Sequence, residues 1–161
     1  MNLKKIISIL LVLIWMIVIF SFSNMDSTKS NNQSKGAIDK VVEVTIDTSN
    51  QLGIVDEVPT EEQKQNIVNK LNKPLRKIMH FTIYLILAIL ILNALNNFNI
   101  KNKTIITIIF CLIYAITDEY HQTLINGRTG QLSDVLIDTI GSIIDTLIYN
   151  KLKINKKMNQ N

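Results

Sequence analysis

The sequence predicts an all-α, polytopic integral membrane protein with four transmembrane helices and a helical extracellular loop between the first and second. Two observations carry this prediction. Ile and Leu are gathered into four long blocks, whereas Lys, Asn and Ser fill the stretches between them. Each block approaches the length of about 20 residues that a helix needs to cross a bilayer. Several of the short flanks are rich in lysine and free of acids, which is typical of membrane proteins. The length of 161 residues is that of a single domain, 1–161.

The four predicted spans are residues 6–23, 78–95, 104–121 and 133–150. An alternative for the first is a cleaved signal peptide, since two lysines precede its apolar core and small serines follow it. The bulky Trp15 and Phe20, and the lack of an A-x-A-like site, favour a span that is retained.

Lysine flanks predict the orientation of these spans in the cell membrane, because cytoplasmic flanks carry an excess of Lys and Arg. With both termini in the cytoplasm, the basic residues on the inner side are Lys4, Lys5, Lys101, Lys103, Lys151, Lys153, Lys156 and Lys157. The short loop after the third span then lies outside and carries only Arg128. The long outer loop, 24–77, also holds basic residues, but a loop of this length is translocated largely regardless of charge.

The outer loop itself has three parts. Residues 24–36, NMDSTKSNNQSKG, predict a flexible linker. The following AIDKVVEVTID predicts an amphipathic helix or a β-branched strand. The segment TEEQKQNIVNKLNK opens with a capping pattern, Thr60 and Gln63, and predicts a helix. We expect both helices to lie on the outer membrane surface or to cover the bundle.

Composition excludes several classes of function. Cys111 is the only cysteine, so an internal disulfide and a metal site built on thiolates are both excluded. The net charge of +4 does not indicate a nucleic-acid partner, because no basic patch is interleaved with aromatic residues. No cofactor is expected.

Polar residues of the fourth predicted span share one face of the helix. At about 100° per residue, Asp134, Asp138, Gly141 and Asp145 fall within roughly 60° of one another. The opposite side, which we expect to face lipid, consists of Val135, Ile137, Ile140, Ile144 and Ile148.

Similar stripes mark the second and third spans. In the third, Tyr114, Asp118 and His121 align, with Gln122 beside Asp118. In the second, Lys77, His80 and Tyr84 align, and Arg76 is adjacent to them. In the predicted topology these polar ends meet at the outer leaflet. Gly127 and Gly130 allow a tight turn between the third and fourth spans, so we expect Arg128 to reach carboxylates of the neighbouring helices.

A family resemblance rests on these same motifs. The segment DEYHQTLINGRTGQLSDVLIDTIGS resembles the signature of the VanZ-like family, in which a D-E-x-H-Q segment, a G-R loop and a D-x-x-x-D-x-x-G helix follow one another. RKIMHFTIYLIL and WMIVIFSFSN are similar to earlier elements of that family. The resemblance implies a small multi-pass membrane protein, typified by the teicoplanin-resistance accessory protein, without an established reaction.

Two readings of the polar residues follow. They form either a paired network that fixes helix packing or a site open to the outer surface. For the site, the candidate catalytic residues are Asp118, Glu119, His121 and Asp138. The candidate substrate-binding residues are Arg76, Lys77, His80, Tyr84, Gln122, Arg128 and Asp134. Carboxylates and imidazole suit Zn²⁺ or Mn²⁺. No metal is expected, because the H-E-x-x-H spacing is absent and the two histidines come from separate helices.

Three functions from different classes are compatible with this site. The favoured one is binding of a cell-envelope component, such as a lipid-linked wall precursor, a teichoic acid or a glycopeptide, among membrane lipids. The second is cleavage or transfer of a phosphoryl or acyl group on a lipid-linked substrate, with His121 as base and Arg128 holding phosphate. The third is an assembly partner whose polar network only holds the fold.

Overall fold

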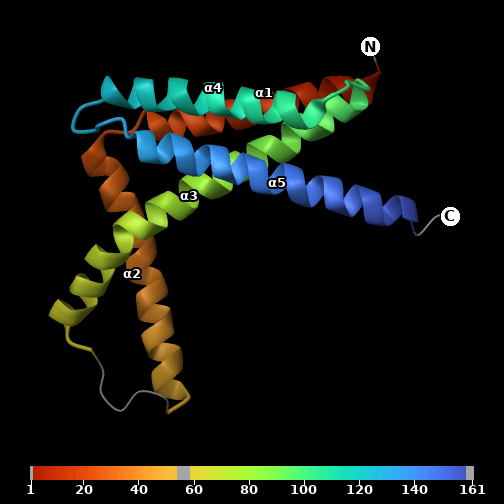
Figure 1. Cartoon of the computed structure of the whole chain (residues 1–161). Helices are drawn as coiled ribbons and strands as arrows, with labels where there is room; N and C mark the ends of the chain where they lie inside the picture. Colours follow the sequence, from red (N-terminus) through yellow and green to blue (C-terminus); the bar gives the residue numbers. More distant parts are fainter. Residues whose placement is uncertain (1, 54–58, 159–161) are drawn as a thin grey trace.

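The protein consists of five helices over the residues that the computed structural model describes, 2–53 and 59–158, with side chains as far as Lys151. These are α1 (Leu3–Ser23), α2 (Ser27–Gln51), α3 (Glu61–Asn97), α4 (Lys103–Thr123) and α5 (Leu132–Met158) (Figure 1). The predicted all-α class is confirmed.

A bundle of α1, α4, α5 and the C-terminal part of α3 forms the body of the molecule. In Figure 1, α1 and α4 run in the same direction and α5 runs back alongside them. Its core is formed by Ile19, Tyr84, Leu87, Ala88, Ile91, Cys111, Ala115 and Val135. Two polar contacts attach α1 to its neighbours: Trp15 Nε1 donates to Ile83 O at 2.9 Å, and Tyr114 Oη donates to Met16 O at 2.8 Å.

Three helices in the described part of the chain are long and apolar enough to cross a membrane, namely α1, α3 and α4. They correspond to the first three predicted spans, and they indicate a multi-pass membrane protein. The fourth predicted span lies in α5, which is helical but is not among these candidates. Its apolar run is interrupted by three aspartates, Asp134, Asp138 and Asp145, and each costs free energy to insert.

The prediction of a flexible linker over residues 24–36 is wrong, because most of this segment belongs to a helix. α2 begins at Ser27, where the Asp26 side chain caps it by accepting from Lys29 N at 2.7 Å. Tertiary contact then holds this polar stretch, since Ser34 Oγ donates to Asn72 Oδ1 of α3 at 2.5 Å. The amphipathic segment that follows is a helix rather than a strand.

Beyond the bundle, α2 pairs with the first half of α3, and the pair projects away from the other helices (Figure 1). Ile38 and Val42 of α2 pack on Val68 of α3. The predicted capping box is confirmed, because Thr60 and Gln63 exchange side-chain and backbone hydrogen bonds. The predicted outer helix and the second span, however, form one continuous helix of 37 residues with Pro74 inside it.

The faces of α5 are only partly as predicted. Asp138, Gly141 and Asp145 are buried, as the stripe requires, and Ile140 is exposed. The prediction that Val135 faces lipid is wrong, because Val135 is 6% exposed and belongs to the core. The physical reason is that α5 packs against both α3 and α4, so its buried sector is wider than the aspartate stripe.

Candidate functional site

The site lies at the end of the bundle where α4 ends, α5 begins and α3 leaves its pairing with α2 to enter the bundle (Figure 1). A close approach of two backbones sets its position. A Cβ built on Gly141 of α5 would lie only 2.7 Å from Phe81 O of α3, so no side chain fits between the helices. This approach brings His80, the neighbour of Phe81, opposite Asp138, which precedes Gly141 by about one helical turn.

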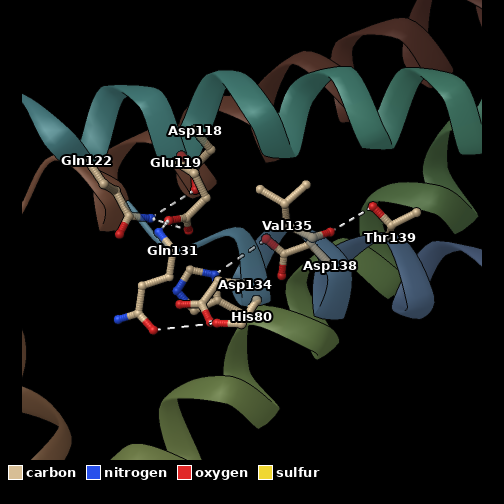
Figure 2. A network of polar contacts seen from close by, with 10 residues as sticks. His80, Asp118, Glu119, Gln122, Gln131, Asp134, Val135, Asp138 and Thr139 are labelled. Atoms are coloured by element: carbon tan, nitrogen blue, oxygen red, sulfur yellow. Dashed lines mark hydrogen bonds and ion pairs between the residues drawn. The ribbon is translucent and has the colours of Figure 1, made fainter. Parts of the chain in front are cut away.

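His80 and Asp138 form an ion pair across this contact. His80 Nδ1 lies 3.6 Å from Asp138 Oδ2, and the Asp138 side chain is fully buried. Neither Asp138 oxygen accepts a hydrogen bond from the described residues, and His80 Nδ1 likewise has no hydrogen-bond partner among them. The pair is drawn in the centre of Figure 2.

Asp118 and Glu119, both 5% exposed, bring two more carboxylates to the same place from α4. Gln122, one turn further along α4, connects them: its Nε2 donates to Asp118 Oδ2 at 3.2 Å and to Glu119 Oε1 at 3.1 Å. The backbone N–H of Gln131 donates to Glu119 Oε2 at 2.8 Å. Figure 2 shows these side chains facing His80 and Asp134.

Gln131 is a residue of the candidate site that was not predicted from the sequence. It acts through its backbone N–H immediately before α5, and the turn that holds it there depends on Gly130. A Cβ on Gly130 would lie 2.6 Å from Glu119 O. The G-x-x-G spacing of the loop was the visible signal, because a glycine beside a helix end indicates close backbone approach.

Arg128 does not pair with the carboxylates, which corrects the expectation from sequence. Among the described residues it makes no ion pair; its Nη1 donates to Ser23 O at 3.1 Å and its Nη2 to Phe22 O at 3.3 Å. The last carbonyls of a helix lack intrahelical partners and carry partial negative charge. The C-terminal end of α1 therefore binds the guanidinium in place of a carboxylate.

A cavity of about 230 Å³ adjoins the carboxylates, between α1, α2, α3 and the end of α4. Its polar wall includes Arg76, His80, Asp118 and Arg128. Its apolar wall consists of Ile19, Phe22, Met25, Ala37, Leu75, Met79 and Ile83. The site therefore has an apolar side beside a charged end.

Comparison with known proteins assigns the chain to a family. The family model described as VanZ/LLP1 matches residues 8–153, which is most of the chain. The chain belongs to the VanZ/LLP1 family. No curated protein and no solved structure matches it. The family resemblance seen in the sequence motifs is thus confirmed, and the protein is a VanZ/LLP1 family membrane protein.

The VanZ/LLP1 fold brings most, but not all, of the predicted site residues together. Those assembled around the carboxylates and the cavity are Arg76, His80, Asp118, Glu119, Gln122, Arg128, Asp134 and Asp138. Tyr84 is fully buried in the core of the bundle. Lys77 is exposed and does not line the cavity.

His121 also lies apart from the carboxylates. Its ring stacks on Phe20 of α1 with the centroids 4.6 Å apart, and its Nε2 is 3.3 Å from Asn24 Oδ1. The contacts of His121 are thus with the end of α1. In this VanZ/LLP1 chain the histidine beside the acids is His80.

Proposed function

We propose that this membrane protein binds an amphipathic component of the cell envelope through its phosphate head group, in the cavity between α1, α2, α3 and α4. A lipid-linked wall precursor has the required chemistry, because it joins an apolar chain to a phosphate. The observation that carries the proposal is the juxtaposition, within one cavity, of an apolar wall and the two arginines Arg76 and Arg128.

The two arginines favour an anion between them. Burial lowers the pKa of the Arg128 guanidinium, and the like charge of Arg76 lowers it further. Two cations that face one cavity repel each other, and a bound phosphate would relieve that repulsion while accepting hydrogen bonds from both. Arg128 has a donor to spare, since its Nε is buried and makes no hydrogen bond with the described residues.

The apolar wall favours a hydrocarbon chain next to that phosphate. Met79 and Phe22 both line the cavity, and each remains about half exposed, at 52% and 50%. Hydrocarbon covering these side chains would remove apolar surface from water. A cavity of about 230 Å³ suits a head group, so the chain of the ligand would extend into the bilayer.

The topology proposed with this function has four spans in one membrane domain, with α5 as the fourth and both termini in the cytoplasm. The cavity then opens on the outer side, where wall precursors are displayed. Binding there would change how glycopeptide antibiotics such as teicoplanin reach their target, as the family resemblance implies.

Direct binding tests the proposal. The purified full-length protein in nanodiscs is titrated with a fluorescent polyprenyl diphosphate, and the matching polyprenyl alcohol serves as the control ligand. We expect Arg76→Gln and Arg128→Gln to weaken diphosphate binding at least tenfold, because each removes one charge-assisted contact. Lys64→Gln is the matched charge control: Lys64 lies on α3 and pairs with Glu61, and its loss should leave binding unchanged.

Equal affinity for the alcohol, or unchanged affinity in both arginine variants, would refute phosphate recognition. In cells, the wild-type gene delivered to a sensitive host should raise the teicoplanin concentration needed for inhibition, and Arg128→Ala should not. Loss of protein abundance in Arg128→Ala, with unchanged lipid affinity, would instead support the role of an assembly partner.

A second candidate function is phosphoryl transfer on the same lipid-linked substrate, and the His80–Asp138 pair favours it. Both His80 and Asp118 line the cavity. With Nδ1 directed at Asp138, Nε2 can take the proton of a water that attacks the terminal phosphorus of the diphosphate. The bridging oxygen then leaves with the polyprenyl monophosphate, and inorganic phosphate is released. Release of phosphate from the diphosphate probe by wild type, but not by His80→Gln, would distinguish an enzyme from a binding protein.

A further inference from the structure

We propose that His80, Asp118 and Glu119 bind a divalent cation of the Mn²⁺ or Zn²⁺ class at the charged end of the cavity. One donor atom from each of these residues lies within 4.8 Å of the other two. Metal–ligand distances for nitrogen and oxygen are about 2.0–2.2 Å, so opposite ligands of one ion lie about 4.4 Å apart at most. Small side-chain rotations are enough to close this set around an ion.

The fold assembles this set from two helices, which is why the sequence predicts no metal. His80 belongs to α3, whereas Asp118 and Glu119 are adjacent on α4. An imidazole with two carboxylates, and with positions open to the cavity, matches the donor types that Mn²⁺ and Zn²⁺ accept. All three side chains are largely buried, so few competing waters surround them.

Asp138 provides an independent observation that points to a ligand. Its carboxylate is fully buried, makes no hydrogen bond with the described residues and is directed at His80 Nδ1 at 3.6 Å. A histidine that binds a metal characteristically presents its other ring nitrogen to a carboxylate, which fixes the ring and raises its basicity. Asp138 occupies that position, and it leaves Nε2 of His80 for the ion.

The charges of the cluster also favour a cation. Three buried carboxylates, Asp118, Glu119 and Asp138, meet here, and within the described side chains His80 is the sole ion-pair partner that any of them has. Arg128, the nearest candidate to neutralise them, is bound to the carbonyls of α1. Buried charges without partners are expensive, and a divalent ion would neutralise two of them.

The hydrogen bonds already present are compatible with an ion. Gln122 and the Gln131 N–H donate to Asp118 and Glu119, and ligating carboxylates are normally held by such donors. Each carboxylate oxygen has two lone pairs, so an oxygen that accepts one hydrogen bond can still bind a metal. These donors would hold the two carboxylates in orientation.

The test uses the purified full-length protein in nanodiscs, stripped with a chelator and then titrated with Mn²⁺ or Zn²⁺ in the absence of any added ligand. Mn²⁺ binding is followed by electron paramagnetic resonance, and Zn²⁺ binding by competition with a chromophoric chelator. We expect one ion per chain in wild type. Glu119→Gln and His80→Asn should each lose binding at least a hundredfold, and Asp138→Asn should lose about ten- to a hundredfold.

Two controls keep the result interpretable if a variant folds poorly. Asp145→Asn removes another buried carboxylate of α5 outside the ligand set, and it should keep wild-type affinity. In wild type, Mn²⁺ should show the electron spin-echo modulation of a bound imidazole nitrogen. With only two histidines in the chain, His121→Asn should retain that signal.

Failure of folded wild type to bind either ion, absence of the imidazole signal, or equal losses in Asp145→Asn and Glu119→Gln would overturn the cation site. The proposal does not rest on lipid binding. Diphosphate binding that persists in Glu119→Gln, with the ion lost, would leave the proposed function standing while the site is confirmed. If wild-type protein binds the ion but does not distinguish the diphosphate from the alcohol, the cation site is confirmed and the proposed function is refuted.

Discussion

Arg128 shows how one residue can keep its predicted place and change its partner. Sequence placed it in the loop beside the carboxylates, which is where it lies, but its guanidinium binds two carbonyls of α1 instead. We predict that Arg128→Lys lowers thermal stability in detergent, because an ammonium cannot reproduce a fork that spans Ser23 O and Phe22 O. Hydrogen bonds to charged groups contribute about 1.5–3 kcal/mol each, so a loss of about that size is expected. A melting temperature equal to that of wild type would mean that charge alone suffices.

Val135 shows the limit of arguments from a helical stripe. Periodicity located the aspartates correctly, but it could not say how wide the buried sector of α5 would be, since that depends on the number of helices packed against it. We predict that Val135→Ala lowers the melting temperature, at a cost of about 1–3 kcal/mol for the lost contacts and the cavity left in the core. Ile140→Ala, at a position 49% exposed, should be mild. Similar losses at the two positions would contradict the burial of Val135.

At the scale of elements, the first three apolar spans and the Thr60 cap could be predicted from the sequence, because each depends on local composition or on residues three apart. The first ten residues of α2 were not, because nothing apolar marks them as a helix. Their helicity depends on contact with α3, as between Ser34 and Asn72, and contacts of that range leave no periodic signal. The one local signal was Asp26, because aspartate is among the residues preferred at the N-cap of a helix. The continuity of α3 through Pro74 was equally invisible, since proline is more often a helix boundary.

Gly141 is where one element fixes the position of another. We predict that Gly141→Ala reduces the yield of folded protein and lowers the affinity of the site for any ligand. The reason is that the new Cβ would push Phe81, and with it His80, away from Asp138. Yield and monodispersity in size-exclusion chromatography measure the effect. Gly36→Ala is the control: a Cβ there meets nothing within 4 Å, and alanine favours the helix by about 1 kcal/mol. A Gly141→Ala protein as abundant as the Gly36→Ala protein would show that α3 and α5 can separate without loss.

For the molecule as a whole, the sequence predicted that polar ends of three helices meet at one end of the bundle, and they do. It could not predict which members of each stripe would meet. The sequence made His121 the candidate base and His80 a candidate substrate-binding residue, yet His80 faces Asp138 and His121 faces α1. That choice follows from the rotation of each helix about its axis, which depends on all of its neighbours at once. The predicted cytoplasmic position of Lys153, Lys156 and Lys157 concerns side chains outside those that the structure describes.

The orientation of the bundle is the last prediction, and the loops at the two ends of α4 provide a matched test. Thr129 and Ile100 are both exposed, one after α4 and one before it. In a Cys111→Ala background, Thr129→Cys should react with an impermeant thiol reagent in intact cells. Ile100→Cys should react only after the cells are permeabilised, because lysine-rich flanks stay in the cytoplasm and Lys101 and Lys103 adjoin it. The opposite pattern would place the carboxylates and the cavity on the cytoplasmic side, where wall precursors displayed outside could not reach them. Labelling of both positions in intact cells would mean that α4 does not cross the membrane.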